Sequence, residues 1–147
     1  MTRKLFAIAI LIVAALLLGR ARPAIADDEK EADMKKLEAI VDNVLKAYND
    51  EDYKKFYADY TKLLKDSLTE QFFKAVVVDG YKKKYGKYLD KTKKLYKPKS
   101  ATKGDMPTLF YLAEFEKDKK AVVAFNFTTE DGAYKILQVQ IMPFMAD

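Results

Sequence analysis

The chain has 147 residues, with 27 basic and 22 acidic side chains and a formal net charge of +5. It contains no cysteine, histidine or tryptophan. These absences exclude disulfides and Ser-His-Asp or Cys-His catalysis, and they argue against a zinc, copper or haem site. We therefore predict no metal and no cofactor, and a domain stabilised by core packing alone.

Residues 1–26 have the pattern of a secretory signal peptide. A basic start precedes an apolar run over residues 5–19, and Ala24 and Ala26 are the small residues that signal peptidase reads. The apolar run is shorter than the roughly 20 residues that a helix needs to cross a membrane. We predict cleavage after Ala26, a mature domain over residues 27–147, and a periplasmic or secreted location. An uncleaved signal is the alternative, and it would be the only contact with a membrane.

Removing the signal changes the charge of the chain. The mature part has 23 lysines and 22 acidic residues, a net charge of +1, and no arginine. Ten lysines and one acidic residue lie within residues 82–103, whereas residues 27–52 carry a local charge of −6. We interpret the lysines as a solvated edge that discourages sheet aggregation, with attraction to an anionic surface or an acidic partner as the alternative. Nucleic acid is not an expected partner, because the chain is predicted to be exported and its mature part lacks arginine.

Three helices are predicted in the first half of the mature chain. After an irregular lead-in, apolar positions at steps of three and four predict a helix over residues 33–48, with Asp33 as its N-cap. An aromatic stripe predicts a second helix that begins near Asp52. A third helix is expected to begin after Ser67 or Thr69, each a suitable cap, and to end at Gly86.

The last third of the chain predicts an antiparallel meander. Alternating side chains indicate strands over residues 109–117, 120–129 and 133–142. The Asp131-Gly132 pair is a strong signal for a hairpin between the last two strands. A lysine-rich edge strand over residues 88–97, closed by Pro98, would be the fourth. The sequence therefore predicts an α+β domain with three N-terminal helices packed on an antiparallel sheet of about four strands.

Each strand of the meander has one nearly pure apolar row and one mixed row. We predict that the apolar row faces the helices. It comprises Leu109, Tyr111, Ala113, Phe115, Ala121, Val123, Phe125, Phe127, Leu137, Val139 and Ile141. The mixed row combines apolar and uncharged polar groups, as the centre of a protein interface does. The candidate interface residues are Phe110, Leu112, Val122, Ala124, Asn126, Ile136, Gln138, Gln140 and Met142.

The order of the elements, together with three short strings, resembles the nuclear-transport-factor-2-like (cystatin-like) superfamily, and in particular its small exported bacterial members. The strings are AYNDEDY at residues 47–53, SLTEQF at 67–72 and EDGAYKI at 130–136. The resemblance implies a cone-shaped fold in which a curved sheet wraps around a long helix. It also implies a cavity at the open end, often of ligand size, and frequent dimers through the outer sheet face. Functions in this superfamily are diverse, so the fold alone assigns none.

We predict a non-enzymatic, exported interaction domain that forms a homodimer or binds an envelope protein through the mixed row. The alternative is a periplasmic carrier or sensor of a small apolar or aromatic ligand held in the cone. Its candidate lining residues, whose hydroxyls could point into a cavity, are Tyr48, Tyr57, Tyr60, Tyr81 and Tyr111.

A lyase or isomerase is the least favoured hypothesis, because such chemistry needs carboxylates inside the cone. Glu114 and Glu116 fall in the outer row, and Asp59 and Asp79 are expected on the solvated surface of the helices. We therefore predict no catalytic residue.

Overall fold

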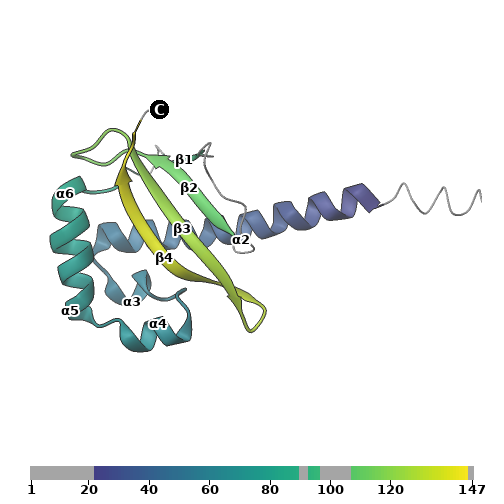
Figure 1. The fold of residues 1–147 in the computed structure, drawn as a ribbon, viewed down its shortest axis with the longest axis horizontal. Helices are drawn as coiled ribbons and strands as arrows, with labels where there is room; N and C mark the ends of the chain where they lie inside the picture. The colour runs from purple at the N-terminus through teal and green to yellow at the C-terminus, as the bar shows by residue number, and fades with distance from the viewer. Residues whose placement is uncertain (1–21, 90–92, 97–106, 146–147) are drawn as a thin grey trace, which may run out of the picture. The chain divides into compact units, whose positions relative to one another are not determined.

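The computed structural model describes residues 22–89, 93–96 and 107–145 (Figure 1). Its helical segments are α2 (Arg22–Asp50), α3 (Tyr53–Phe56), α4 (Lys62–Ser67), α5 (Glu70–Phe73), the π-helix η1 (Lys74–Lys82) and α6 (Lys83–Tyr85). Its strands are β1 (Lys94–Tyr96), β2 (Thr108–Ala113), β3 (Ala121–Glu130) and β4 (Ala133–Pro143). The chain divides into two compact units, Met1–Glu38 and Ala39–Asp147. None of the helices in the described ranges is both long enough and apolar enough to span a bilayer.

The first unit is described from residue 22 onward, and this part is helical. Most of the predicted signal peptide lies outside the described residues, while Ala24 and Ala26 fall within α2. The predicted helix start at Asp33 is wrong, because α2 already begins at Arg22. Pro23 suits a first helical turn, where its missing N–H costs nothing.

Four strands in the order β1-β2-β3-β4, all antiparallel to their neighbours, make the sheet of the second unit. The predicted α+β class with a four-stranded antiparallel sheet is therefore confirmed. The predicted hairpin is confirmed as well, since Asp131 and Gly132 both adopt positive φ, at 52° and 75°. The predicted edge strand is shorter than expected, with β1 limited to three residues and Tyr88 forming an isolated bridge to Phe115. Its predicted end at Pro98 lies outside the described residues.

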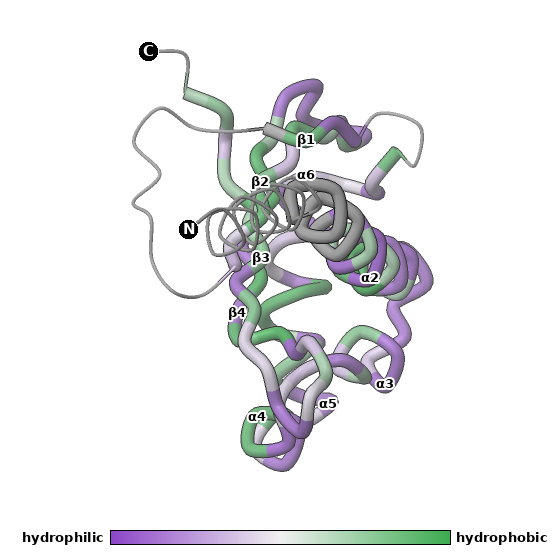
Figure 2. Tube along the Cα trace, turned by 90° about the vertical axis from the view of Figure 1, so that its right-hand side faces the viewer, coloured by the Kyte–Doolittle hydropathy of each residue, from purple (hydrophilic) through white to green (hydrophobic). Residues whose placement is uncertain are grey.

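The apolar row of the sheet faces the helices. Figure 2 shows α2, α3 and α5 on one side of the strands. On that side Phe115 meets the rings of Tyr48 from α2 and of Tyr85 from α6, with centroid distances of 5.9 and 5.8 Å. Val123, Phe125 and the other inward residues of β3 are fully buried. The prediction that this row forms the core is confirmed for β2 and β3.

In β4 a bulge reverses the predicted faces of Ile136 and Leu137, whereas residues 138–142 keep the predicted faces. Asn126 pairs with Gln138, but the next residue, Phe127, pairs with Ile136, so Leu137 is the extra residue. Beyond a bulge the alternation continues with the opposite phase. Ile136 is therefore 0% exposed and Leu137 is 36% exposed. The prediction of Ile136 as an interface residue is wrong, and so is that of Leu137 as a core residue.

The predicted second helix is broken, whereas the predicted third helix is confirmed: α5, η1 and α6 run without a gap from Glu70 to Tyr85 and end at Gly86. Asp52 caps α3 by accepting a hydrogen bond from the Lys55 N–H at 3.1 Å, and Thr69 caps α5 in the same way. Between α3 and α4 the backbone leaves the helix in order to pair with β4. The Ile136 N–H donates to the Asp59 carbonyl at 2.8 Å, and the Thr61 N–H donates to the Ile136 carbonyl at 3.2 Å. The predicted second helix is therefore divided by a segment that covers the edge of the sheet.

The π-helix η1 continues α5 and keeps one stripe of side chains in line. Phe73, Val77, Tyr81 and Tyr85 follow one another at intervals of four residues, and all but Tyr81 are buried. At 3.6 residues per turn such a stripe drifts by about 40° at each step. The wider turn closed by i→i+5 bonds opposes that drift. The π-helix therefore lets one face remain buried from α5 through α6.

Candidate interaction surface

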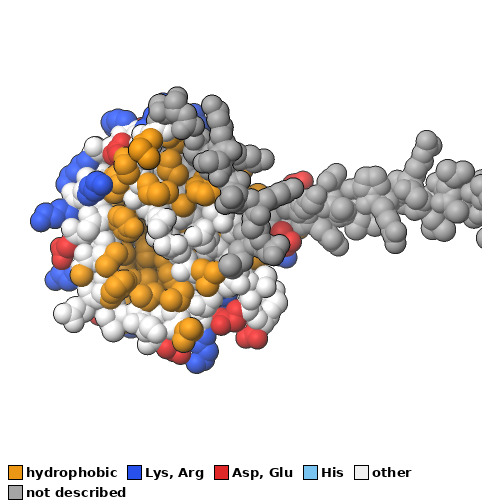
Figure 3. Space-filling model, viewed as in Figure 1, with side chains coloured by type: hydrophobic (Ala, Val, Ile, Leu, Met, Phe, Trp, Pro, Cys, Tyr) orange, Lys and Arg blue, Asp and Glu red, His pale blue; other side chains and the backbone are white. Residues whose placement is uncertain are grey.

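The side of the sheet that does not face the helices carries three rows of uncharged side chains, and each row contains one residue from each of the neighbouring strands β2, β3 and β4. We call these nine residues the outer face. In register they are Thr108–Asn126–Gln138, Phe110–Ala124–Gln140 and Leu112–Val122–Met142. Figure 3 is viewed from this side and shows apolar side chains gathered over the strands, with lysines at the margin.

The first row is a ladder of polar side chains that bond to one another. The Thr108 hydroxyl donates to Asn126 Oδ1 at 3.0 Å, and Asn126 Nδ2 donates to Gln138 Oε1 at 3.1 Å. Because these groups satisfy one another, the row can be brought toward a partner at a smaller desolvation cost than three unpaired groups. The exposed Gln138 amide still has donors for a partner.

In each of the other two rows, a smaller residue on β3 lies between larger residues on β2 and β4. Val122 and Ala124 on the central strand are only 8% and 5% exposed, between bulkier residues on either side. The flanking Phe110, Leu112 and Met142 are half-buried. The prediction that Val122 and Ala124 lie in the outer row is confirmed. A partner would nevertheless contact mainly the larger residues beside them on β2 and β4.

The five tyrosines of the ligand hypothesis are divided among different surroundings. Tyr57 and Tyr60 come together, with ring centroids 5.0 Å apart, beside Phe56 and Phe73. Tyr48 instead donates its hydroxyl to the Gly86 carbonyl at 2.8 Å. The remaining two, Tyr81 and Tyr111, contact the rings of Tyr85 and Phe125, respectively. A role for these tyrosines in ligand binding stays a prediction.

Burial disfavours the charged form of several of these phenols. It raises the pKa of Tyr57 to about 12. Burial, with further repulsion from Tyr57 and Tyr81, also raises the pKa of Tyr60 above its ordinary value near 10. The pKa of Tyr48 is raised mainly by burial, and in addition by Glu116 and Tyr85. These hydroxyls are therefore neutral donors or acceptors rather than bases at neutral pH.

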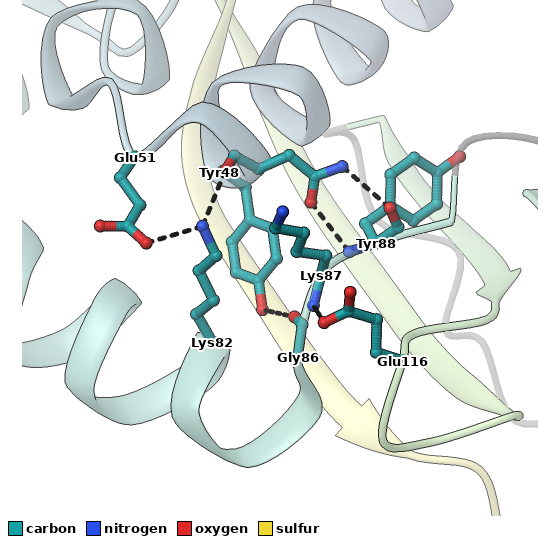
Figure 4. A network of polar contacts seen from close by, with 8 residues as sticks. Tyr48, Glu51, Lys82, Gly86, Lys87, Tyr88 and Glu116 are labelled. Atoms are coloured by element: carbon teal, nitrogen blue, oxygen red, sulfur yellow. Dashed lines mark hydrogen bonds and ion pairs between the residues drawn. The ribbon is translucent and has the colours of Figure 1, made fainter.

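A polar network holds the end of α2 against the segment that follows α6 (Figure 4). Asn49 Nδ2 donates to the Tyr88 carbonyl and Asn49 Oδ1 accepts from the Tyr88 N–H, both at 2.8 Å. Lys82 Nζ donates to the Asn49 carbonyl at 2.7 Å and pairs with Glu51 at 2.8 Å. This lysine thus caps the C-terminus of α2, where a positive charge is favourable.

Gly86 lies at the centre of the same network. Its φ is +79°, and a Cβ there would come within 2.8 Å of Glu116 Cβ. The Glu116 carboxylate accepts from the Lys87 N–H at 2.9 Å. Sequence reasoning recognised Gly86 only as a helix stop, and it missed the partners because they lie about 30 to 40 residues away along the chain.

The carboxylates considered for catalysis do not assemble a site in the described part of the chain. Glu116 is engaged with backbone, Asp79 is exposed, and Asp59 is half-buried beside the edge of β4. In the ranges that the structure describes, no three carboxylates are placed to hold a metal ion.

The comparisons with known proteins give no relative. No family model matches the chain, and neither a curated protein nor a solved structure is similar to it. Membership of the nuclear-transport-factor-2-like superfamily therefore stays a prediction from element order and short strings.

Proposed function

We propose that this domain is a non-enzymatic module that self-associates through the outer face of its sheet. On the strength of the predicted signal peptide, we place it in the periplasm or outside the cell. The observation that carries the proposal is the set of three uncharged rows in a chain of which 33% is charged. Aromatic, Met and amide side chains around an apolar centre are typical of interfaces.

A second copy of the chain suits this face better than an unrelated protein does. A two-fold interface sets the same patch against itself, so a charge close to the axis would lie near an identical charge. The nine residues of the outer face carry no charge to repel their copy, and the nearest lysines, Lys94 in register with Leu112 and Lys135 in register with Thr128, lie at its margin. Its amides, on Asn126, Gln138 and Gln140, can each donate and accept, so identical rows can hydrogen-bond across the axis. The superfamily resemblance, which implies dimers through this face, agrees with the proposal.

The test introduces like charges at the proposed axis. The double variant Gln138→Lys/Gln140→Lys changes two residues that are exposed and half-buried, respectively, and places four extra positive charges in a dimer interface. Light scattering coupled to size exclusion, over a range of concentrations, should show a dimer for the parent protein. The variant should dimerise at least tenfold more weakly.

The matched control is Asn43→Lys/Gln71→Lys, which adds the same charge at exposed positions on α2 and α5. This control should dimerise as the parent does, and all three proteins should melt cooperatively. A monomeric parent protein at every concentration, or a double variant with the parent's mass, would overturn the proposal.

A further inference from the structure

A second surface of the molecule lies where α6 meets the turn between β2 and β3. We call it the basic end, and its lysines are Lys82, Lys83, Lys84, Lys87, Lys117, Lys119 and Lys120. Two segments about 30 residues apart are held together here by backbone contacts. The Lys117 N–H donates to the Tyr85 carbonyl at 2.9 Å, and the Glu116 N–H donates to the Lys87 carbonyl at 2.9 Å. The sequence showed two separate groups of lysines, and the fold joins them.

The positive charge of the basic end is not neutralised by its own acidic residues. Residues 82–88 and 114–120 carry seven lysines and three carboxylates, those of Glu114, Glu116 and Asp118, a net charge of +4, and counting Glu51, which pairs with Lys82, leaves +3. The Glu116 carboxylate accepts from the Lys87 N–H, and the Asp118 carboxylate accepts from the Lys120 N–H at 3.0 Å.

The lysine ammonium groups are mostly available to an external anion. In the part of the chain that the structure describes, Lys82 is the one lysine of the seven that forms an ion pair. Lys117 Nζ donates a hydrogen bond to the Lys83 carbonyl at 2.8 Å. Lys83, Lys84 and Lys87 are all exposed.

An exposed apolar group adjoins these lysines. The Phe144 N–H donates to the Lys120 carbonyl at 3.3 Å, and Lys120 Nζ lies 5.1 Å from the centre of the Phe144 ring. The next residue, Met145, is 80% exposed. Lysines beside an exposed apolar side chain match a lipid surface, where headgroup phosphates take the charge and the acyl boundary takes the apolar group. A purely acidic peptide would satisfy the lysines but would leave Met145 exposed.

We propose that the basic end binds anionic lipid bilayers, with its lysines against the headgroups and Met145 at the level of the acyl boundary. This goes beyond membrane contact through an uncleaved signal, and it does not depend on self-association through the outer face.

The probe is a set of vesicles of phosphatidylcholine with and without about one third phosphatidylglycerol, and the readout is flotation of the exported protein. Binding should require the anionic lipid and should weaken strongly as salt is raised. Each lysine near such a surface contributes about fivefold in affinity. The variant Lys83→Gln/Lys84→Gln/Lys87→Gln should therefore bind about 100-fold more weakly. Met145→Ser should reduce binding at both low and high salt.

The matched control is Lys46→Gln/Lys54→Gln/Lys74→Gln, which removes the same charge from α2, α3 and η1. This control should bind nearly as the parent protein does. Equal binding to neutral vesicles, as an uncleaved signal would give, overturns the proposal. The proposal is also overturned if the two triple variants lose the same amount of vesicle binding. It is overturned as well if the protein binds soluble polyglutamate but not anionic vesicles.

Discussion

Replacing Ile136 by alanine is expected to destabilise the domain far more than the same change at Leu137. Ile136 is fully buried opposite Phe127, and the change removes three carbon atoms. Transfer of those carbons accounts for about 2.4 kcal/mol, and the cavity left behind adds to it, for a total of about 3 kcal/mol within a usual range of 2–5. Leu137 is already 36% exposed, so its truncation should cost about 1 kcal/mol or less.

The assay is equilibrium unfolding in urea, followed by circular dichroism and by tyrosine fluorescence. Both variants should unfold with the parent's dependence on denaturant, so that the midpoint reports stability alone. In a thermal scan Ile136→Ala should lower the melting temperature by roughly 10 °C or more, and Leu137→Ala by a few degrees at most.

The reverse order of the two effects would refute the bulge. Strict alternation through β4 would place Leu137 in the core and Ile136 on the outer face, and Leu137→Ala would then be the damaging change. Leu137→Lys extends the comparison, because it should be tolerated at an exposed position whereas Ile136→Lys should prevent folding.

Three further predictions follow from the other contacts. Gly86→Ala should cost about 1–3 kcal/mol, since φ is +79° and the new Cβ would meet a side-chain carbon at 2.8 Å. Gly80→Ala should be neutral or stabilising, because its Cβ would meet the Ala75 carbonyl oxygen at an ordinary contact distance of 3.5 Å inside a helix, and equal urea midpoints for the two variants would contradict this. Asn49→Asp places a carboxylate oxygen against the Tyr88 carbonyl oxygen, so it should lower the free energy of unfolding by about 1–3 kcal/mol in the same assay. An unchanged urea midpoint would mean that Asn49 does not pair with the Tyr88 backbone. Burial raises the pKa of Tyr57 to about 12, so as the pH rises the unfolded chain loses the phenol proton before the folded chain does. The free energy of unfolding should therefore fall above pH 10, by up to about 1.4 kcal/mol per pH unit from this residue. Tyr57→Phe should make this decline less steep, and an unaltered slope would count against the burial of Tyr57.

Local patterns predicted the elements whose causes are local. Alternation predicts β2 and β3, a dipeptide suited to positive φ predicts the hairpin, and Thr69 is one of the two caps, with Ser67, that the sequence offers for the third helix. In each case the residues that fix the structure are within a few positions of one another, so they can be read without the fold.

The elements that were missed depend on partners elsewhere in the chain. Ile136 and Leu137 are equally apolar, so only pairing with Phe127 decides which of them is buried. The π-helix carries a stripe whose partners lie elsewhere in the chain, since Phe73 contacts Phe56 of α3 and Tyr85 contacts Phe115. The contacts of Asn49 and Lys82 join segments more than 30 residues apart. The same holds for the basic end, whose two lysine groups become one surface only after folding.

The pairing of residues 59–61 with β4 has a consequence for how the domain assembles. The hairpin of β3 and β4 closes through a two-residue turn, so it can form before the helical half arrives. Until then the backbone of Ile136 is open to strands from other molecules. Fibril growth from partly folded chains is therefore expected to begin at β4, and variants that delay docking of residues 59–61 should shorten its lag time in a dye-binding assay.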